Sequence, residues 1–235
     1  MNSAAISQGP KMSSTHLFSS AFGASGMADV TPIVFVVDDD VSVRESLQLL
    51  IGCEGWQPRT FASAQEFFAR PPALVPNCLI LDVFLAGLDG LDVQKRASIE
   101  RPEMPIIFIT GHGDVRTTVQ AMKAGAVEFL TKPFREEVIL TAIREALERS
   151  RLALGYEAEM SVLRDRYSSL SPRERQVMSL VVSGLLNKQV GGELGISEIT
   201  VKAHRGQVMQ KMKANSLPDL VRMATRLRLG PAVNS

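Results

Sequence analysis

The sequence predicts two domains, a doubly wound α/β domain with a five-stranded parallel sheet and a small all-helical domain after it. The first is predicted by short β-branched apolar segments that alternate with amphipathic helical segments between residues 33 and 134. The second is predicted by a change of pattern at Ser171, after which helix-capping signals and short helical segments follow one another. At 235 residues the chain is long for one compact domain and comfortable for two small ones.

Five segments of the first domain have the composition of strands. They are "IVFVV" (33–37), "CLIL" (78–81), "IIFI" (106–109) and two shorter candidates at 58–61 and 128–130. Amphipathic helices are predicted at 43–52 and at 115–125, and Gly125 ends the second one. Functional groups of a doubly wound sheet gather at the carboxyl ends of its strands, which directs attention to the residues that follow each strand.

The composition argues against several classes of protein. No apolar segment approaches the roughly 18 residues of a membrane span, so we expect no membrane partner. The two cysteines, Cys53 and Cys78, lack the spacing of a disulfide framework or a zinc site, which favours a reducing cytoplasm. Residues 1–30 are rich in Ser, Ala and Gly without a periodic pattern, so we expect a disordered extension, and Met27 is an alternative start.

A helical segment joins the two domains. Residues 136–166 are rich in helix formers and contain no proline. Heptad spacing relates Leu140, Leu147 and Leu154 and, after a shift of phase, Tyr156, Leu163 and Leu170. Such a helix either pairs with a second copy of the chain or covers its own domain, and the sequence leaves both readings open. We assign residues 31–150 to the α/β domain, 151–168 to a helical linker and 169–235 to the helical domain.

Helix signals define the second domain. "SPRE" has the form of a capping box, with Ser171 as the N-cap and Glu174 three residues later. Helices are predicted at about 172–183, 187–194, 198–213 and 217–228. The break "GIS" separates the second helix from the third, and Ser197 caps the third. A small core is expected from Val190, Leu194, Ile196, Val201, Val208 and Met212.

Polar residues follow four of the predicted strands. They are Asp38 and Asp39 after the first, Asp82 after the third, Thr110 after the fourth and Lys132 after the fifth. Parallel strands bring these ends together, and three adjacent carboxylates repel one another unless a cation lies among them. Because all the ligands are oxygens, we expect Mg²⁺.

The roles of these side chains follow from their chemistry. Asp38 and Asp39 are expected to hold the metal, and Asp82 supplies one ligand oxygen and a nucleophile toward a phosphoryl group. Lys132 and the Thr110 hydroxyl then bind the phosphoryl oxygens. We also expect a cis peptide bond between Lys132 and Pro133, which would fix the aim of the lysine.

The segments "VVDDD", "LDVFLAGLDG", "FITGHGD" and "AGAVEFLTKPF" resemble the receiver domain of bacterial response regulators. The resemblance covers about residues 31–150 and implies a flavodoxin-like, or CheY-like, fold. It also implies phosphorylation of Asp82 by a sensor histidine kinase, Mg²⁺ ligation completed by the Phe84 carbonyl, and switching through Thr110 and Phe129.

The sequence departs from the receiver pattern at one position in particular. Ala86 stands where the family commonly has proline, which would loosen the loop that carries the metal-binding carbonyl. Phe84 and His112, each two residues after a pocket residue, flank the path of water to the phosphorylated aspartate. We expect the bulky Phe84 to slow hydrolysis.

The two domains differ in charge. Residues 29–135 contain ten basic and fourteen acidic residues, for a net charge of −4, whereas residues 171–235 contain ten basic and four acidic residues, for +6. The exposed face of helix 198–213 combines lysines with small residues, which suits a helix that enters the major groove of DNA. The predicted DNA contacts are Lys188, Thr200, Lys202, His204, Arg205 and Gln210.

Two of these residues, Arg205 and His204, lie away from the centre of the exposed helix face. Arg205 lies at the edge of the helix face, better placed for the DNA backbone than for bases. His204 is either a partly buried structural residue or a phosphate contact, and it has no second histidine at metal-ligand spacing.

The segments "LSPRERQVM", "ITVKAHR" and "SLPDLVRMA" resemble the LuxR/FixJ type of helix-turn-helix. The resemblance implies that 198–213 is the recognition helix and that the last helix forms a dimer contact on DNA. The whole chain then resembles a FixJ-type regulator, with double-stranded DNA, RNA polymerase and, on phosphorylation, a second copy of itself as partners. Gly191 stands where the family has a small alanine, and we expect Gly191 and Gly192 each to cost about 1 kcal/mol against alanine.

Two other functions share some of these features. A Mg²⁺-dependent phosphatase or phosphotransferase would use an aspartyl phosphate, but it predicts a DxD motif that begins with the nucleophile and a cap domain. The expected nucleophile, Asp82, begins no DxD motif, and the sequence predicts no cap domain. A DNA-binding protein that works without phosphorylation would not need the full Asp, Thr and Lys set. We therefore expect no enzyme activity beyond the chain's part in its own phosphorylation and dephosphorylation.

Overall fold

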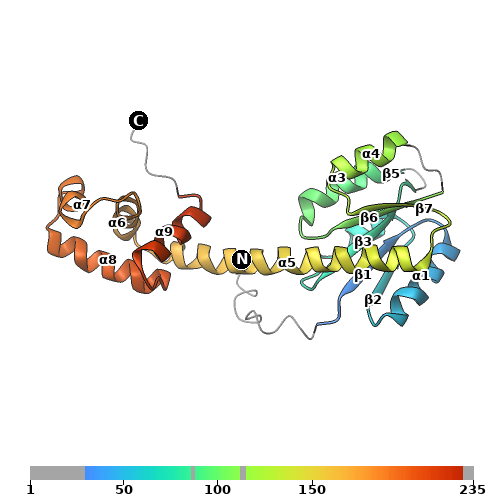
Figure 1. The fold of residues 1–235 in the computed structure, drawn as a ribbon, viewed down its shortest axis with the longest axis horizontal. Coiled ribbons are helices and arrows are strands. Elements are labelled where there is room, and N and C mark those ends of the chain that lie inside the picture. Colours follow the sequence, from blue (N-terminus) through green and yellow to red (C-terminus); the bar gives the residue numbers. More distant parts are fainter. Residues whose placement is uncertain (1–29, 86–87, 112–114, 230–235) are drawn as a thin grey trace, which may run out of the picture. The chain divides into compact units, whose positions relative to one another are not determined.

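The computed structural model describes residues 30–85, 88–111 and 115–229 (Figure 1). These residues form two units, the first ending at Tyr156 and the second beginning at Glu157. The sequence predicts a disordered extension at residues 1–30, and residues 1–29 of it lie outside the described residues. Within the described ranges, no helix combines the length and apolar character that a membrane crossing requires.

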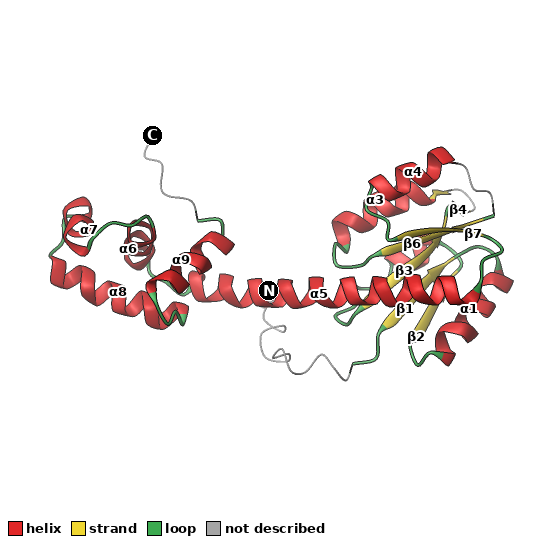
Figure 2. Cartoon of the chain, in the orientation of Figure 1, coloured by secondary structure: helices red, strands yellow, loops and turns green. Residues whose placement is uncertain are grey.

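The first unit is built on a parallel sheet with the strand order β2-β1-β3-β6-β7 (Figure 2). Neighbouring strands pair in parallel throughout. The strands are β1 (Ile33–Val37), β2 (Gln57–Phe61), β3 (Asn77–Asp82), β6 (Ile106–Thr110) and β7 (Glu128–Thr131). The predicted doubly wound sheet is therefore confirmed, with each of the five predicted strands within one residue of its expected bounds.

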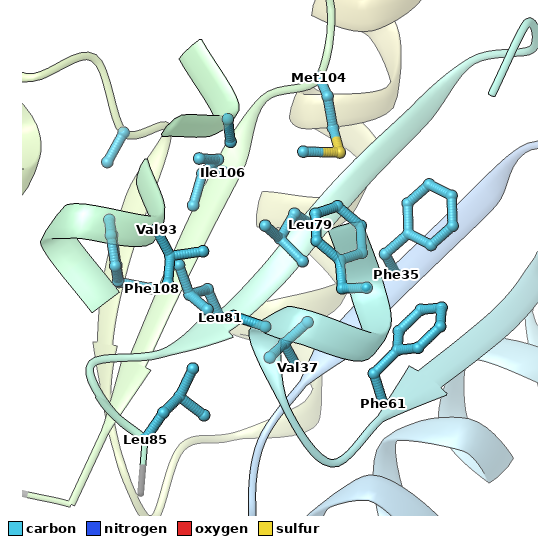
Figure 3. Packing of buried hydrophobic residues seen from close by; sticks show 14 of the residues in the cluster. Phe35, Val37, Phe61, Leu79, Leu81, Leu85, Val93, Met104, Ile106 and Phe108 are labelled. Atoms are coloured by element: carbon cyan, nitrogen blue, oxygen red, sulfur yellow. The ribbon is translucent and has the colours of Figure 1, made fainter. Parts of the chain in front are cut away.

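Two cores lie on opposite faces of this sheet, because alternate residues of each strand point to opposite sides. Phe35, Leu79 and Phe108 belong to the core that Figure 3 shows, which Val93 of α3 (Gly90–Glu100) and Phe67 of α2 (Ala64–Phe68) complete. The other face buries residues from α1 (Val41–Cys53) and α5 (Glu136–Ser168), and its members include Val34, Val36, Ile80, Ile107, Leu47, Ile51, Ile139 and Ile143. Both faces are covered, which explains why the strands read as continuous apolar segments.

The helices of this unit are α1 (Val41–Cys53), α2 (Ala64–Phe68), α3 (Gly90–Glu100), α4 (Val115–Lys123) and the part of α5 (Glu136–Ser168) that ends at Tyr156. The sequence pattern predicted α1, α4 and α5 individually but not α2 or α3. The reason is that α2 has only five residues and α3 buries few apolar side chains, Val93 and Ala97. A short antiparallel pair, β4 (Phe84–Leu85) with β5 (Leu88–Asp89), was also not predicted.

Trp56, the only tryptophan of the sequence, lies just before β2 and packs against the core formed with α1 and α5. The guanidinium carbon of Arg144, on α5, lies 5.9 Å from the centroid of the indole ring. The same guanidinium pairs with Glu54 at 2.6 Å. These contacts join the end of α1 to the first third of α5 within the first unit.

The second unit contains α6 (Pro172–Val182), α7 (Asn187–Leu194), α8 (Glu198–Met212) and α9 (Leu217–Arg226). The predicted capping box is present, because Ser171 accepts a hydrogen bond from the Glu174 backbone and the Glu174 carboxylate accepts one from the Ser171 backbone. Val190 and Val201 share one apolar cluster, and Val208 and Met212 share another with the end of α5. The predicted all-helical domain is confirmed.

Three of the heptad leucines have partners within their own units. Leu147 is buried in the core of the first unit. Leu163 and Leu170 are buried in the second unit, beside Met178, Val208 and Leu220. The spacing of these three residues is therefore explained by packing inside each unit, and it needs no second copy of the chain.

Gly191 does not behave as the sequence predicts. A Cβ atom at this position would lie 2.7 Å from the backbone oxygen of Ile196, where real Cβ contacts essentially never occur. At Gly192, by contrast, a Cβ would have nothing within 4 Å. The expected cost of about 1 kcal/mol therefore remains a prediction for Gly192, whereas at Gly191 a Cβ fits only if the backbone of α7 shifts away from the turn before α8.

The two glycines make a matched pair for a stability measurement. We expect Gly192→Ala to stabilise the second unit by about 1 kcal/mol through helix propensity. Gly191→Ala brings no net gain, because overpacking costs roughly 1–3 kcal/mol and offsets the same propensity term. Differential scanning calorimetry of the whole chain measures both, at about 4–8 °C per kcal/mol for a unit of this size. An equal rise in melting temperature for both variants would contradict the close approach at Gly191.

Candidate functional site

The predicted strand-end residues meet at one edge of the sheet. Asp38 follows β1, and Asp82 and Thr110 are the last residues of β3 and β6. Lys132 follows β7, and its ammonium Nζ donates hydrogen bonds to Asp38 Oδ2 at 2.7 Å and Asp82 Oδ2 at 2.6 Å. The Lys132 backbone N–H also bonds to the Thr110 carbonyl at 2.7 Å. One lysine thus joins residues from three other strand ends.

Three carboxylates share this edge. One ligand oxygen from each of Asp38, Asp39 and Asp82 can be chosen so that all lie within 4.8 Å of one another. Asp38 and Asp82 are buried, whereas Asp39 is exposed. With Lys132 these side chains carry a formal charge of −2, which a hard divalent cation neutralises with the oxygen ligands that it prefers. The residues present therefore fit Mg²⁺.

For both Asp38 and Lys132, burial and hydrogen bonding shift the pKa in opposite directions. Burial raises the pKa of the Asp38 carboxyl above its usual value, and the hydrogen bonds from Lys132 and Asp40 only partly offset this. Burial alone would lower the pKa of the Lys132 ammonium, but its hydrogen bonds to Asp38 and Asp82 raise it overall. Lys132 is therefore a permanent cation at neutral pH. The peptide bond between Lys132 and Pro133 is cis, as predicted.

Two hydrogen bonds and one close backbone approach fix the chain around Asp82. Asp82 Oδ1 accepts a hydrogen bond from the Phe84 N–H at 2.9 Å, and the Val83 N–H continues the ladder to the Ile109 carbonyl at 3.0 Å. A Cβ at Gly90 would lie 2.8 Å from the Asp82 carbonyl oxygen and 2.9 Å from the Val83 Cα. The missing side chain of Gly90 lets α3 begin directly against the strand end that carries Asp82.

Of the remaining residues predicted to act in the receiver, the structure describes Phe84, Thr110 and Phe129. Phe84 is 57% exposed and follows Asp82 by two residues. Thr110 is fully buried, and the half-buried Phe129 lies with its ring centroid 6.1 Å from that of Phe108. Ala86, Gly87 and His112 lie outside the described residues.

The second unit contains the predicted helix-turn-helix, formed by α7 and α8. Gly195 ends α7 in the left-handed conformation at φ 65°, and the Ser197 hydroxyl caps α8 by accepting from the Thr200 N–H at 3.1 Å. Helix α8 buries Val201, Val208 and Met212 on one face. The opposite face is open, and Ile199 on it is 80% exposed.

The predicted DNA contacts divide into two groups. Lys188, Thr200, Lys202 and Gln210 are exposed, whereas His204 and Arg205 are half-buried. The Lys202 ammonium lies 3.0 Å from Glu198 Oε1, and Arg205 donates to Asn187 Oδ1 at 3.2 Å, which links α8 to α7. Gln207 is also exposed and lies on the edge of the same helix face, so helical periodicity could have added it to the prediction.

A partly buried ion pair holds α8 against α6. Lys211 Nζ donates to both carboxylate oxygens of Glu174, at 2.7 and 3.0 Å. The hydrogen bond from Lys211 holds the pKa of Glu174 below its usual value, and the bond from the Ser171 backbone adds to this. The capping carboxylate of α6 therefore also fixes the carboxyl-terminal end of α8, an anchor that the sequence pattern did not reveal.

Comparison with known families agrees with both units. Residues 34–144 match the family described as response regulator receiver domain, and residues 168–224 match the one described as bacterial regulatory proteins, luxR family. The chain is 49% identical over 205 residues to nodulation protein W of Bradyrhizobium diazoefficiens, covering 87% of this chain and 90% of that protein.

Other relatives share the whole two-domain arrangement in sequence. The transcriptional regulatory protein FixJ of the same species is 42% identical, over 82% of this chain and 94% of FixJ. The solved structure of the response regulator StyR superposes with a TM-score of 0.74 at 43% identity, covering 84% of this chain and all of that one. The chain therefore belongs to the two-component response regulators that join a receiver domain to a LuxR-type DNA-binding domain, the family of FixJ.

Proposed function

We propose that Asp82 accepts a phosphoryl group from a sensor histidine kinase and that its phosphorylation makes the chain dimerise and bind DNA. The observation that carries the proposal is the Asp82 carboxylate itself, 6% exposed at a strand end and 2.6 Å from the Lys132 ammonium. A buried carboxylate with a fixed cation at one oxygen is suited to receive a group that brings further negative charge. The domain bounds proposed with this function are 31–150, 151–168 and 169–235.

The transfer balances with the groups that the site provides. A carboxylate oxygen of Asp82 attacks the phosphorus of a phosphohistidine, an O–P bond forms, and the P–N bond to the kinase's histidine breaks. Lys132 then binds a phosphoryl oxygen while Asp38 keeps the ammonium in place, and the Thr110 hydroxyl binds another. The metal would be held by Asp38, Asp39, Asp82 and the Phe84 carbonyl. When bound, Mg²⁺ supplies neutralisation of the charge that collects on the phosphoryl oxygens.

Phosphorylation adds about −1.5 to −2 charges to the carboxyl edge of the sheet. Thr110 and Lys132 are drawn toward the phosphoryl group, and Phe129 turns with the strand that carries Lys132. The surface of α4 and β7 changes as a result, and Val119 and Met122 on α4 are exposed apolar residues at which a second receiver can pack. Pairing of receivers is thus the step that links Asp82 to DNA.

Dimerisation doubles the contacts to a two-fold operator. In each copy the exposed residues Lys188, Thr200, Lys202 and Gln210 face DNA, while His204 and Arg205 serve the phosphate backbone at the edge of α8. Helix α9 is the proposed dimer contact on DNA, and RNA polymerase is the proposed downstream partner. We place this work in the bacterial cytoplasm, where a histidine kinase and DNA meet.

Phosphorylation from acetyl phosphate and Mg²⁺ tests the proposal directly. We expect the wild-type chain to gain one phosphoryl group, to become dimeric and to bind DNA more tightly, and we expect Asp82→Ala to do none of these. Intact-mass spectrometry, size-exclusion chromatography and DNA-shift assays measure the three steps. Labelling at another residue would support a phosphotransferase, and DNA binding unchanged by the loss of Asp82 would support a regulator that works without phosphorylation.

Lys202 tests the DNA face. We expect Lys202→Gln to weaken binding across DNA sequences and to reduce the slope of log K against log salt by about 0.9 for each phosphate that the side chain neutralises in the wild type. Lys95→Gln is the matched control, because Lys95 is an exposed lysine of the receiver that pairs with Asp92. Fluorescence anisotropy at several salt concentrations measures the slope. A slope that both substitutions leave unchanged would rule out Lys202 as a phosphate contact.

Phe84 tests the lifetime of the phosphorylated state. Its exposed ring follows Asp82 closely and restricts the approach of water, so we expect Phe84→Arg to dephosphorylate several times faster than wild type. Decay of the phosphorylated chain after removal of acetyl phosphate is the measurement. Equal or slower decay in the variant would show that the ring does not protect the phosphoryl group.

A further inference from the structure

The loop between β1 and α1 is held by a side chain that neither the sequence motifs nor the comparisons assign to the site. Arg44, in the first turns of α1, reaches back over the acidic loop. Its Nη1 donates hydrogen bonds to the backbone carbonyl oxygens of Asp38 at 2.7 Å and Asp39 at 2.9 Å. A single guanidinium nitrogen therefore holds the two carbonyls that belong to the two proposed metal ligands of this loop.

The Asp38 and Asp40 carboxylates of the loop have hydrogen-bond partners other than Arg44. Asp38 Oδ1 accepts from the Asp40 N–H at 2.9 Å, and Asp38 Oδ2 accepts from Lys132. The Asp40 carboxylate caps α1 by accepting from the Ser42 N–H at 2.8 Å. Helix α1 thus has its own N-cap, and Arg44 is not needed to begin the helix.

Arg44 differs from the other cations near the loop in what it binds. Within the described residues, no carboxylate lies in ion-pair contact with its guanidinium, which binds backbone oxygens instead. Asp38 is fully buried, so its carbonyl gains a strong charge-assisted donor that water could not easily replace. The bonds to two consecutive carbonyls restrict the rotation of both peptide planes.

We propose that Arg44 is a positioning residue for the metal site, which orients the Asp38 and Asp39 carboxylates by holding their backbone. This inference rests on the proposed function, because it concerns the Mg²⁺ that phosphorylation of Asp82 requires. The direction in which a carboxylate leaves the chain depends on the two peptide planes beside it, and Arg44 fixes both planes beside Asp39 and the plane on the carboxyl side of Asp38. Partners that orient metal ligands in this way typically change metal affinity by 10–100-fold when they are removed.

The proposed positioning role and simple electrostatics predict opposite changes in Mg²⁺ affinity when Arg44 is replaced. Removing a positive charge close to a cation site should strengthen binding of Mg²⁺ if charge alone decides. Removing the two hydrogen bonds should weaken it, because the carboxylates lose their common orientation. Arg44→Met removes both the charge and the bonds, whereas Arg44→Lys keeps the charge on a shorter side chain with a different shape.

Calorimetric titration of the unphosphorylated whole chain with MgCl₂ distinguishes the positioning role of Arg44 from an effect of its charge alone. We expect Arg44→Met to weaken Mg²⁺ binding about tenfold, and Arg44→Lys to weaken it as well. Arg135→Met is the charge-matched control, because Arg135 follows Lys132 by three residues but makes no bond to the acidic loop among the contacts of the described residues. We expect this control to retain the wild-type affinity.

Phosphorylation kinetics separate positioning from general damage. With acetyl phosphate as donor, we expect Arg44→Met to need about ten times more Mg²⁺ for half-maximal rate and to reach the wild-type rate at saturating Mg²⁺. Unchanged or tighter Mg²⁺ binding in Arg44→Met overturns the proposal, as does a wild-type affinity in Arg44→Lys or a rate that stays low at saturating Mg²⁺. Failure of wild type to bind Mg²⁺ would instead overturn the proposed function of the site.

Discussion

The receiver unit depends on the hydrogen bonds of one lysine. Lys132 reaches two strand ends with its ammonium, at Asp38 and Asp82, and a third with its backbone N–H, at Thr110. Two carboxylates this close would repel each other and resist burial without a cation between them. The same lysine therefore stabilises the acidic edge, and in the proposed function it also supplies the cation that a phosphoryl group needs.

The sequence predicts this site well because its residues occupy positions that the strand pattern defines. Continuous apolar segments fix the ends of β1, β3 and β6, and parallel pairing brings Asp38, Asp82 and Thr110 together whatever the loops do. The same holds for α8, whose periodicity separates the buried Val201 and Val208 from the exposed Lys202. Features that follow from periodicity and topology can thus be read without coordinates.

What the sequence misses depends on distances between backbones or on long side chains. A side chain at Gly90 would collide with the backbone carbonyl oxygen of Asp82, and one at Gly191 with that of Ile196. The pattern of apolar residues in a sequence does not reveal such close approaches between backbones. Arg44 looks like an ordinary helix-surface residue until its bonds to the acidic loop are seen. Contacts of this kind require the relative placement of segments, which local propensity does not determine.

The position of Trp56 has a practical consequence for spectroscopy. As the only tryptophan of the sequence, packed between the end of α1 and Arg144 of α5, it makes the tryptophan fluorescence of the chain a property of the receiver unit alone. Intrinsic fluorescence can therefore follow the unfolding of this unit, while circular dichroism at helical wavelengths follows both. The two domains can be resolved in one sample, without labels and without separating them.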